Sequence, residues 1–228
     1  MARSASILAA IYFALIAVAF VVFTAIYLVS SPFVVTTAVR MTQSSSSLPL
    51  AERVYVGSLT SQNVRSAKRS IELVEYYRQD EASGPESIGH LLDVRDSFVK
   101  VWTGWVASSI TLVSALIIVW WRQAGTWLRM SLRIAAGLCI SFTSAIGIVV
   151  LFAFDSLFTF LHEIIFPQGN WQFPPDSLLV QVFPTPFWVI MMSLLLLFVF
   201  VAGVLIAFGT LTRVSQSFFP AHDNAFYL

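Results

Sequence analysis

The sequence has few charged residues and a single cysteine. Asp, Glu, Lys and Arg make up 11% of the 228 residues, whereas roughly a quarter of a typical soluble domain is charged. Thirteen basic side chains nearly balance twelve acidic ones, which excludes the strongly basic character of a nucleic-acid-binding protein. The lone Cys139 excludes an internal disulfide, and we expect it to be a small buried side chain. The composition indicates a membrane protein.

Four apolar stretches without charged residues are long enough to cross a lipid bilayer. Each would extend about 30 Å as a helix, and it must be helical because lipid offers the backbone no hydrogen-bond partners. These stretches are residues 7–29, 101–121, 134–154 and 187–208. The sequence therefore predicts an all-α integral membrane protein with four transmembrane helices, in which residues 1–228 form one domain.

The charges between the apolar stretches predict the orientation in the membrane. Arg122, Arg129 and Arg133 lie between the second and third stretches without any acidic residue, whereas residues 155–186 contain acidic residues but no Lys or Arg. Short loops rich in Lys and Arg remain in the cytoplasm. We therefore expect cytoplasmic N and C termini and two extracytoplasmic loops, residues 40–100 and 155–186, with helices at the membrane interface.

The patterns within these two loops predict short helices. Apolar residues among scattered charges favour an amphipathic helix from about 51 to 77, and a second helix is expected to run without interruption from about 87 to 121. In the other loop, residues 158–166 are too apolar to lie in water and are typical of an interfacial helix. Asp176 is a candidate N-cap for another one. No pattern assigns a role to residues 42–77.

Two of the three histidines lie in the predicted extracytoplasmic loops. His90 is followed by Asp93, at a spacing that puts both on one helical face, and His162 is adjacent to Glu163. The third, His222, lies in the predicted cytoplasmic tail and receives no role. Ionisable groups close to lipid cost free energy and often mark function. The first two histidines are therefore the candidate site.

Two chemistries could use this pair of histidines. An imidazole titrates near neutral pH and can act as a general acid or base while a carboxylate fixes its tautomer. Alternatively, both could bind the metal of a metal-dependent lipid hydrolase or acyltransferase, together with one or two of Glu86, Asp93 and Glu163. Metal-site and nucleophile motifs are missing from the sequence, so we expect neither a metal nor another cofactor. A non-enzymatic membrane sensor or scaffold is a further alternative.

The sequence around these histidines resembles a known family. Residues 162–171 (HEIIFPQGNW), followed by 173–179 (FPPDSLL), are similar to the signature of the bacterial lipoprotein intramolecular transacylase family, Lit. The block E-x-x-x-H-L-x-D-V from Glu86 to Val94 is similar to a second signature of that family. The predicted layout of four spans and two outer loops also resembles it.

The resemblance implies an acyltransferase of the bacterial plasma membrane that acts at the outer leaflet. Its substrate would be a diacylated lipoprotein, with membrane lipid as the surroundings. The enzyme would move the acyl chain from the sn-2 ester of the S-diacylglyceryl group to the α-amino group of the N-terminal cysteine, giving a lyso-form lipoprotein. The two essential histidines of the family correspond to His90 and His162.

This reaction agrees with the residues that are present. Ester and amine belong to one molecule, so correct positioning alone gives a high effective concentration and no acyl-enzyme is required. The α-amino group has a pKa near 8, so a neutral imidazole must remove a proton from it. We cast His162 as this base, which later protonates the glyceryl oxygen, and His90 as a hydrogen-bond donor to the oxyanion, held by Asp93. The two roles could also be exchanged.

Three further residues are expected to support the site. Asn170 is a candidate oxyanion donor or, equally, a turn residue after Gly169. Trp171 is expected to pack at the membrane interface. Arg95 could bind a lipid phosphate or, as we prefer, pair with a carboxylate of the loops.

Overall fold

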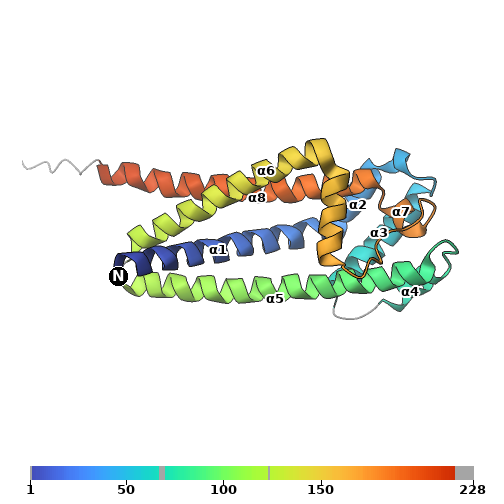
Figure 1. Cartoon of the computed structure of the whole chain (residues 1–228), viewed down its shortest axis with the longest axis horizontal. Coiled ribbons are helices and arrows are strands. Elements are labelled where there is room, and N and C mark those ends of the chain that lie inside the picture. Colours follow the sequence, from blue (N-terminus) through green and yellow to red (C-terminus); the bar gives the residue numbers. More distant parts are fainter. Residues whose placement is uncertain (1, 67–69, 123, 219–228) are drawn as a thin grey trace, which may run out of the picture.

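The computed structural model describes residues 2–66, 70–122 and 124–218, and in these residues it is entirely helical. Four long helices run along the long axis of the molecule (Figure 1). They are α1 (Ala2–Val29), α5 (Gly84–Arg122), α6 (Gly125–Ile165) and α8 (Thr185–Phe218). Each contains a segment long and apolar enough to cross a membrane, judged by length and composition. The predicted all-α class with four such helices is confirmed.

Small residues allow the long helices to pack closely. At Gly203 of α8, a Cβ atom would lie 2.9 Å from Cβ of Cys139 on α6. At Gly104 of α5, it would lie 2.6 Å from the ring of Phe23 on α1. Membrane helices associate through such contacts because lipid tails supply no hydrophobic driving force between helices. Cys139 is only 1% exposed, which agrees with its expected role as a small buried side chain.

Helix α5 is longer than a membrane requires. It contains 39 residues and is therefore about 58 Å long, roughly twice the thickness of the bilayer core. It begins at Gly84, slightly before the expected start near residue 87, and it continues unbroken through the apolar stretch 101–121. Its first turns, which include His90, therefore extend well beyond that stretch.

Helix α6 is kinked. The backbone of Ala153 has φ −147° and ψ 41°, which is not helical, and the kink falls at the end of the apolar stretch 134–154. Figure 1 shows the last part of α6 turning across the bundle towards α5. The helix expected at residues 158–166 is present as the segment of α6 beyond the kink, which stops at Ile165; its position at the membrane interface stays a prediction. The kink aims this segment at His90.

Short helices gather at one end of the bundle and form what we call the cap (Figure 1). They are α2 (Pro32–Met41), η1 (Gln43–Ser45), α3 (Leu50–Arg65), α4 (Ile71–Arg78) and α7 (Leu178–Val182). The predicted single helix from 51 to 77 was wrong, since α3 and α4 are separate elements. The N-cap of α7 is Ser177, whose side chain accepts a hydrogen bond from the backbone of Val180, and not Asp176.

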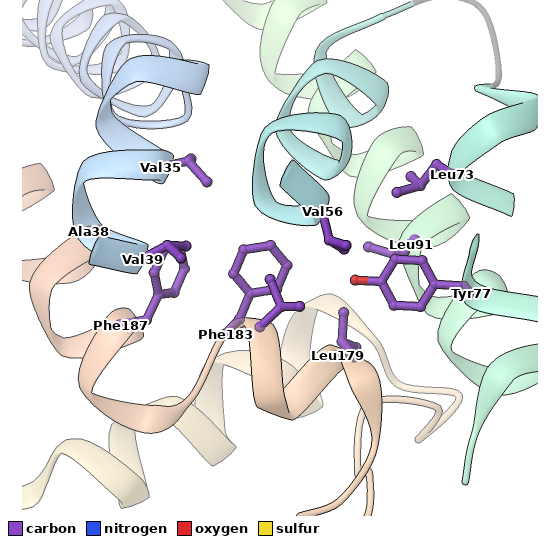
Figure 2. Packing of buried hydrophobic residues seen from close by; sticks show 11 residues of the cluster. Val35, Ala38, Val39, Val56, Leu73, Tyr77, Leu91, Leu179, Phe183 and Phe187 are labelled. Atoms are coloured by element: carbon purple, nitrogen blue, oxygen red, sulfur yellow. The ribbon is translucent and has the colours of Figure 1, made fainter. Parts of the chain in front are cut away.

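The cap has its own apolar core, which reaches α5 and the start of α8 (Figure 2). Val56 of α3 lies between Phe183 on one side and Leu91 and Tyr77 on the other. Tyr77 is fully buried. Because Leu91 belongs to this core, the cap fixes the position of the adjacent His90.

One buried charge joins three elements of the cap. The guanidinium group of Arg53 is fully buried and donates hydrogen bonds to the carbonyl oxygen and hydroxyl group of Thr42, at 2.8 and 3.1 Å, and to the carbonyl oxygen of Val182 at 3.3 Å. Thr42 is the C-cap of α2, and Val182 is the last residue of α7. The C-terminal end of a helix carries partial negative charge, so both ends stabilise the cation. Arg53 thereby links α2, α3 and α7.

Candidate active site

The two imidazoles expected to form the site lie together. His90 projects from the part of α5 that packs in the cap and is 7% exposed. His162 lies on α6 beyond the kink. Their ring centroids are 6.3 Å apart, and the ring planes differ by 26°. The structure therefore brings together two residues separated by more than seventy positions in the sequence.

The tautomer of His162 is set by its own helix. Its Nδ1 atom lies 2.8 Å from the carbonyl oxygen of Phe158, one turn earlier. A carbonyl oxygen only accepts hydrogen bonds, so Nδ1 carries the proton and donates it. The other nitrogen, Nε2, makes no hydrogen bond with any residue that the structure describes. In the neutral imidazole Nε2 has a free lone pair, which is the form a general base requires.

The polar groups behind His90 are arranged differently from the expectation. The carboxylate of Asp93 makes no hydrogen bond with the imidazole; its Oδ2 atom accepts hydrogen bonds from the side-chain amides of Asn170 at 2.5 Å and Gln168 at 2.9 Å. Both amides come from the turn after α6, which contains Gly169 with φ +77°, a conformation that favours glycine. Asn170 thus lies against Asp93 and lines neither of the pockets that contain the histidines.

Burial keeps both imidazoles neutral. The two histidines lie outside the apolar spans 101–121 and 134–154. Burial lowers the pKa of His90 to about 4, and the neighbouring His162 lowers it further, while Asp93 and Asn170 act in the opposite direction. Burial also lowers the pKa of His162, and the hydrogen bond to the Phe158 carbonyl partly opposes this effect. At neutral pH both rings can therefore accept a proton.

Aromatic rings enclose both imidazoles. The ring centroids of Phe158 and Trp171 lie 3.9 and 5.0 Å from that of His162, and the ring of Phe166 lies 4.7 Å from that of His90. Trp171 was expected to pack at the membrane interface, whereas here it contacts the candidate site. Apolar surroundings of this kind have a low dielectric constant, which strengthens the electrostatic interactions of any group bound there.

Two pockets meet at the imidazoles, and both are lined by His90 and His162. The first, which we call the membrane-side pocket, has a volume of about 380 Å³ and an almost entirely apolar lining that reaches Val101 and Leu195 in the long helices. The second, which we call the outer pocket, has a volume of about 330 Å³ and a more polar lining that includes Gln172. The site can therefore take a ligand that is apolar at one end and polar at the other.

Three of the expected supporting residues lie away from the imidazoles. Glu86 is exposed and lines neither pocket. Glu163 is also exposed and lies with Asp155 along a separate groove of α6. Arg95 donates a hydrogen bond from Nε to the carbonyl oxygen of Ser66 at 3.0 Å, so it joins α5 to the end of α3; its expected pairing with a carboxylate of the loops stays a prediction.

The carboxylates that could have bound a metal together with the two histidines do not form a ligand group with them. In residues 2–66, 70–122 and 124–218, no three His, Cys, Asp or Glu side chains are grouped as metal ligands. The set that we had considered, which combined the two histidines with Glu86, Asp93 and Glu163, is therefore not assembled. The arrangement fits proton transfer between the imidazoles and a substrate.

Several residues of the site were not identified as candidates from the sequence. Phe158 and Trp188 line both pockets, Phe166 lines the membrane-side pocket, and Phe173 lines the outer pocket. An available signal was the density of aromatic residues between 154 and 173, in a segment too apolar for a water-exposed loop. We interpreted residues 158–166 as an interfacial helix because the kink of α6, which turns this segment inwards, has no marker such as proline or glycine.

Comparisons with known proteins identify the family and a similar fold. Residues 6–188 match the family described as lipoprotein intramolecular transacylase Lit. The fold is similar to the structure of the membrane integral lipoprotein intramolecular transacylase Lit from Bacillus cereus, with a TM-score of 0.78 and 15% sequence identity, over 94% of this chain and 98% of that one. Two structures of histidine variants of the same protein match with TM-scores of 0.64 at 15% identity, over 90% of this chain and 92% and 94% of theirs. No curated protein matches in sequence.

The four apolar helices, the membrane-integral structural relative and the matched family define a multi-pass membrane acyltransferase. Because the match covers most of the sequence, the chain belongs to the lipoprotein intramolecular transacylase family, Lit.

Proposed function

We propose that this protein moves an acyl chain within a single diacylated lipoprotein. The chain would leave the sn-2 ester of the S-diacylglyceryl group and join the α-amino group of the N-terminal cysteine, giving the lyso form. The observation that carries the proposal is the pair of imidazoles, with ring centroids 6.3 Å apart, where an apolar and a more polar pocket meet.

The two pockets suit the two ends of such a substrate. The acyl chains would occupy the membrane-side pocket, whose apolar lining continues into the lipid-spanning helices. The N-terminal cysteine and the residues after it would occupy the outer pocket near Trp171 and Gln172. The glyceryl group would then bend around His90 and His162. Holding ester and amine in contact can replace a concentration of about 10⁵ M or more.

The proton transfers can be assigned to the protein's own groups. His162 donates its Nδ1–H to the carbonyl oxygen of Phe158, which leaves the lone pair of Nε2 free. Nε2 therefore accepts a proton from the substrate's α-amino group as the nitrogen of that group attacks the ester carbonyl. The same imidazole then protonates the sn-2 glyceryl oxygen as the C–O bond breaks. The products are an amide and a free hydroxyl group. No serine or cysteine nucleophile takes part in this sequence of steps, and no cofactor is required.

The proposed location is the outer leaflet of the bacterial plasma membrane. Arg122, Arg129 and Arg133 lie at the end of the bundle opposite the cap (Figure 1). The positive-inside rule assigns that end to the cytoplasm, with both termini there. The cap and the two histidines would then lie outside, where lipoproteins are anchored.

The proposal is tested by mass spectrometry of a lipoprotein N-terminus from cells that express the wild type, His90→Ala or His162→Ala. We expect the lyso form from the wild type and at least a hundredfold less from either variant, because acid–base catalysis contributes about 10²–10⁴. His222→Ala is the chemically matched control and should retain activity. Unchanged acylation in both histidine variants, at equal amounts of protein in the membrane, would refute the proposal.

A chelation experiment tests the metal alternative separately. The purified protein should keep full activity after prolonged treatment with EDTA, since the proposed steps use only imidazoles. Loss of activity that is restored by adding a divalent metal would favour the metal-dependent mechanism.

A further inference from the structure

The carboxylate of Asp93 determines how the amide of Asn170 is oriented. An ionised carboxylate accepts hydrogen bonds and cannot donate them. The Asn170 group 2.5 Å from Asp93 Oδ2 must therefore be the NH₂ group and not the amide oxygen. Gln168 donates to the same oxygen at 2.9 Å, so the carboxylate has two amide donors. The oxygen of the Asn170 amide consequently points to the other side of that side chain.

Asn170 and His90 each hold one buried polar atom without a partner. Both Oδ1 of Asn170 and Nδ1 of His90 are completely buried and have no hydrogen-bond partner. Buried polar atoms are nearly always paired, and catalytic hydrogen bonds that are long in the free enzyme often shorten when the substrate binds. One of these atoms is an acceptor, and the other can be a donor. Each is therefore the natural partner of the other.

We infer that Asp93 fixes the tautomer of His90 through Asn170, by holding the amide so that its Oδ1 accepts a hydrogen bond from Nδ1–H of His90. Asn170 and Asp93 are then positioning residues that act through the imidazole and do not touch the substrate. The closeness of Asn170 also raises the pKa of His90, as an acceptor facing a ring N–H should.

The inferred tautomer changes the role of His90, and this consequence rests on the proposed function. With the proton on Nδ1, the neutral ring presents a lone pair at Nε2, so it accepts a proton and cannot donate to an oxyanion. His162 presents the same form. An α-ammonium group that becomes a secondary amide loses two protons: one passes to the glyceryl oxygen, and the other leaves to water. The two imidazoles, each with a free lone pair at Nε2, could accept one of these protons each.

The inference can be tested by ¹⁵N nuclear magnetic resonance of histidine-labelled protein in detergent micelles at neutral pH. The chain has only three histidines, so each signal can be assigned by substituting one residue. The chemical shifts distinguish Nδ1–H from Nε2–H directly. In the wild type we expect His90 to be in the Nδ1–H form.

The decisive variant is Asp93→Asn. The new amide can donate to Asn170, whose own amide can then turn and offer NH₂ to His90 Nδ1. This arrangement moves the ring proton to Nε2. We expect the His90 signal to change to the Nε2–H form and the turnover number to fall by about a hundredfold or more. Asp96→Asn removes the same charge from an exposed position one turn further along α5 and should change neither quantity.

Asn170→Ala provides a second test in case Asp93→Asn does not fold. It removes the acceptor, so His90 should show a mixture of both tautomers. An Nε2–H form in the wild type, or an unchanged Nδ1–H form in both variants, would overturn the inference. If the tautomers change as expected but the wild type makes no lyso lipoprotein, the positioning by Asp93 and Asn170 stands and the proposed function fails.

Discussion

The burial of His90 predicts that acid destabilises the folded protein. In the fold its pKa is lowered from 6.5 to about 4, and after unfolding the imidazole returns to water and its ordinary pKa. Between pH 4 and pH 6.5, His90 therefore binds a proton in the unfolded chain but not in the folded chain. Stability is therefore complete above pH 6.5, decreases as the pH falls towards 4, and levels off below that value.

The size of the effect follows from the two pKa values. Near pH 5 an imidazole of ordinary pKa is almost entirely protonated, whereas His90 at 7% exposure is still almost entirely neutral. This difference corresponds to a loss of about 2 kcal/mol in the free energy of unfolding relative to neutral pH. His162 contributes in the same direction, because its pKa is also lowered.

The assay compares the wild type with His90→Ala, so that the contribution of His162 cancels. Denaturant unfolding in detergent micelles gives the free energy of unfolding of each protein near pH 7 and near pH 5. We expect the wild type to lose about 2 kcal/mol more than the variant between these conditions. Equal losses in the two proteins would show that His90 is not held neutral by burial, and the argument from its environment would be refuted.

Two further predictions concern packing. Replacing Arg53 by Met should lower the free energy of unfolding by about 1–3 kcal/mol, because it removes the side-chain donor to the buried Val182 carbonyl group and one of the donors to Thr42. Thermal unfolding measures this loss, and the exposed Arg40→Met is the control. Gly203→Val should destabilise the protein by about 1–3 kcal/mol, since its Cβ would lie 2.9 Å from an atom of α6, whereas Gly209→Val meets no atom within 4 Å. A cost for either variant no larger than that of its control would contradict the packing described above.

The helices could be predicted from the sequence because their signal is local. Uninterrupted apolar stretches such as 101–121 identify a membrane helix without any knowledge of its neighbours. The continuation of α5 through His90 was also predictable, because Gly84-Pro85 is followed by no further helix-breaking residue. The division between α3 and α4 was missed, since their helical patterns differ little in sequence and the separation depends on contacts within the cap.

The arrangement of the site depends on tertiary contacts that leave little trace in the sequence. The spacing of Asp93 and His90 suggested a direct contact, because both lie on one helical face. The carboxylate instead accepts from Asn170 and Gln168 of another segment, which the kink at Ala153 brings to α5. Nothing in the residues around Ala153 marks that kink. Pairing His90 with His162 was possible because the chain has only three histidines and these two lie in the predicted extracytoplasmic loops.

The most direct test of intramolecular transfer is a crossover experiment with the purified protein. Two diacylated lipopeptides are mixed, one unlabelled and one carrying both a heavy sn-2 acyl chain and a heavy peptide, and the N-acylated products are analysed by mass spectrometry. The proposed transfer within one molecule predicts only products in which heavy chain and heavy peptide remain together. Products with a heavy chain on a light peptide would contradict transfer within one molecule.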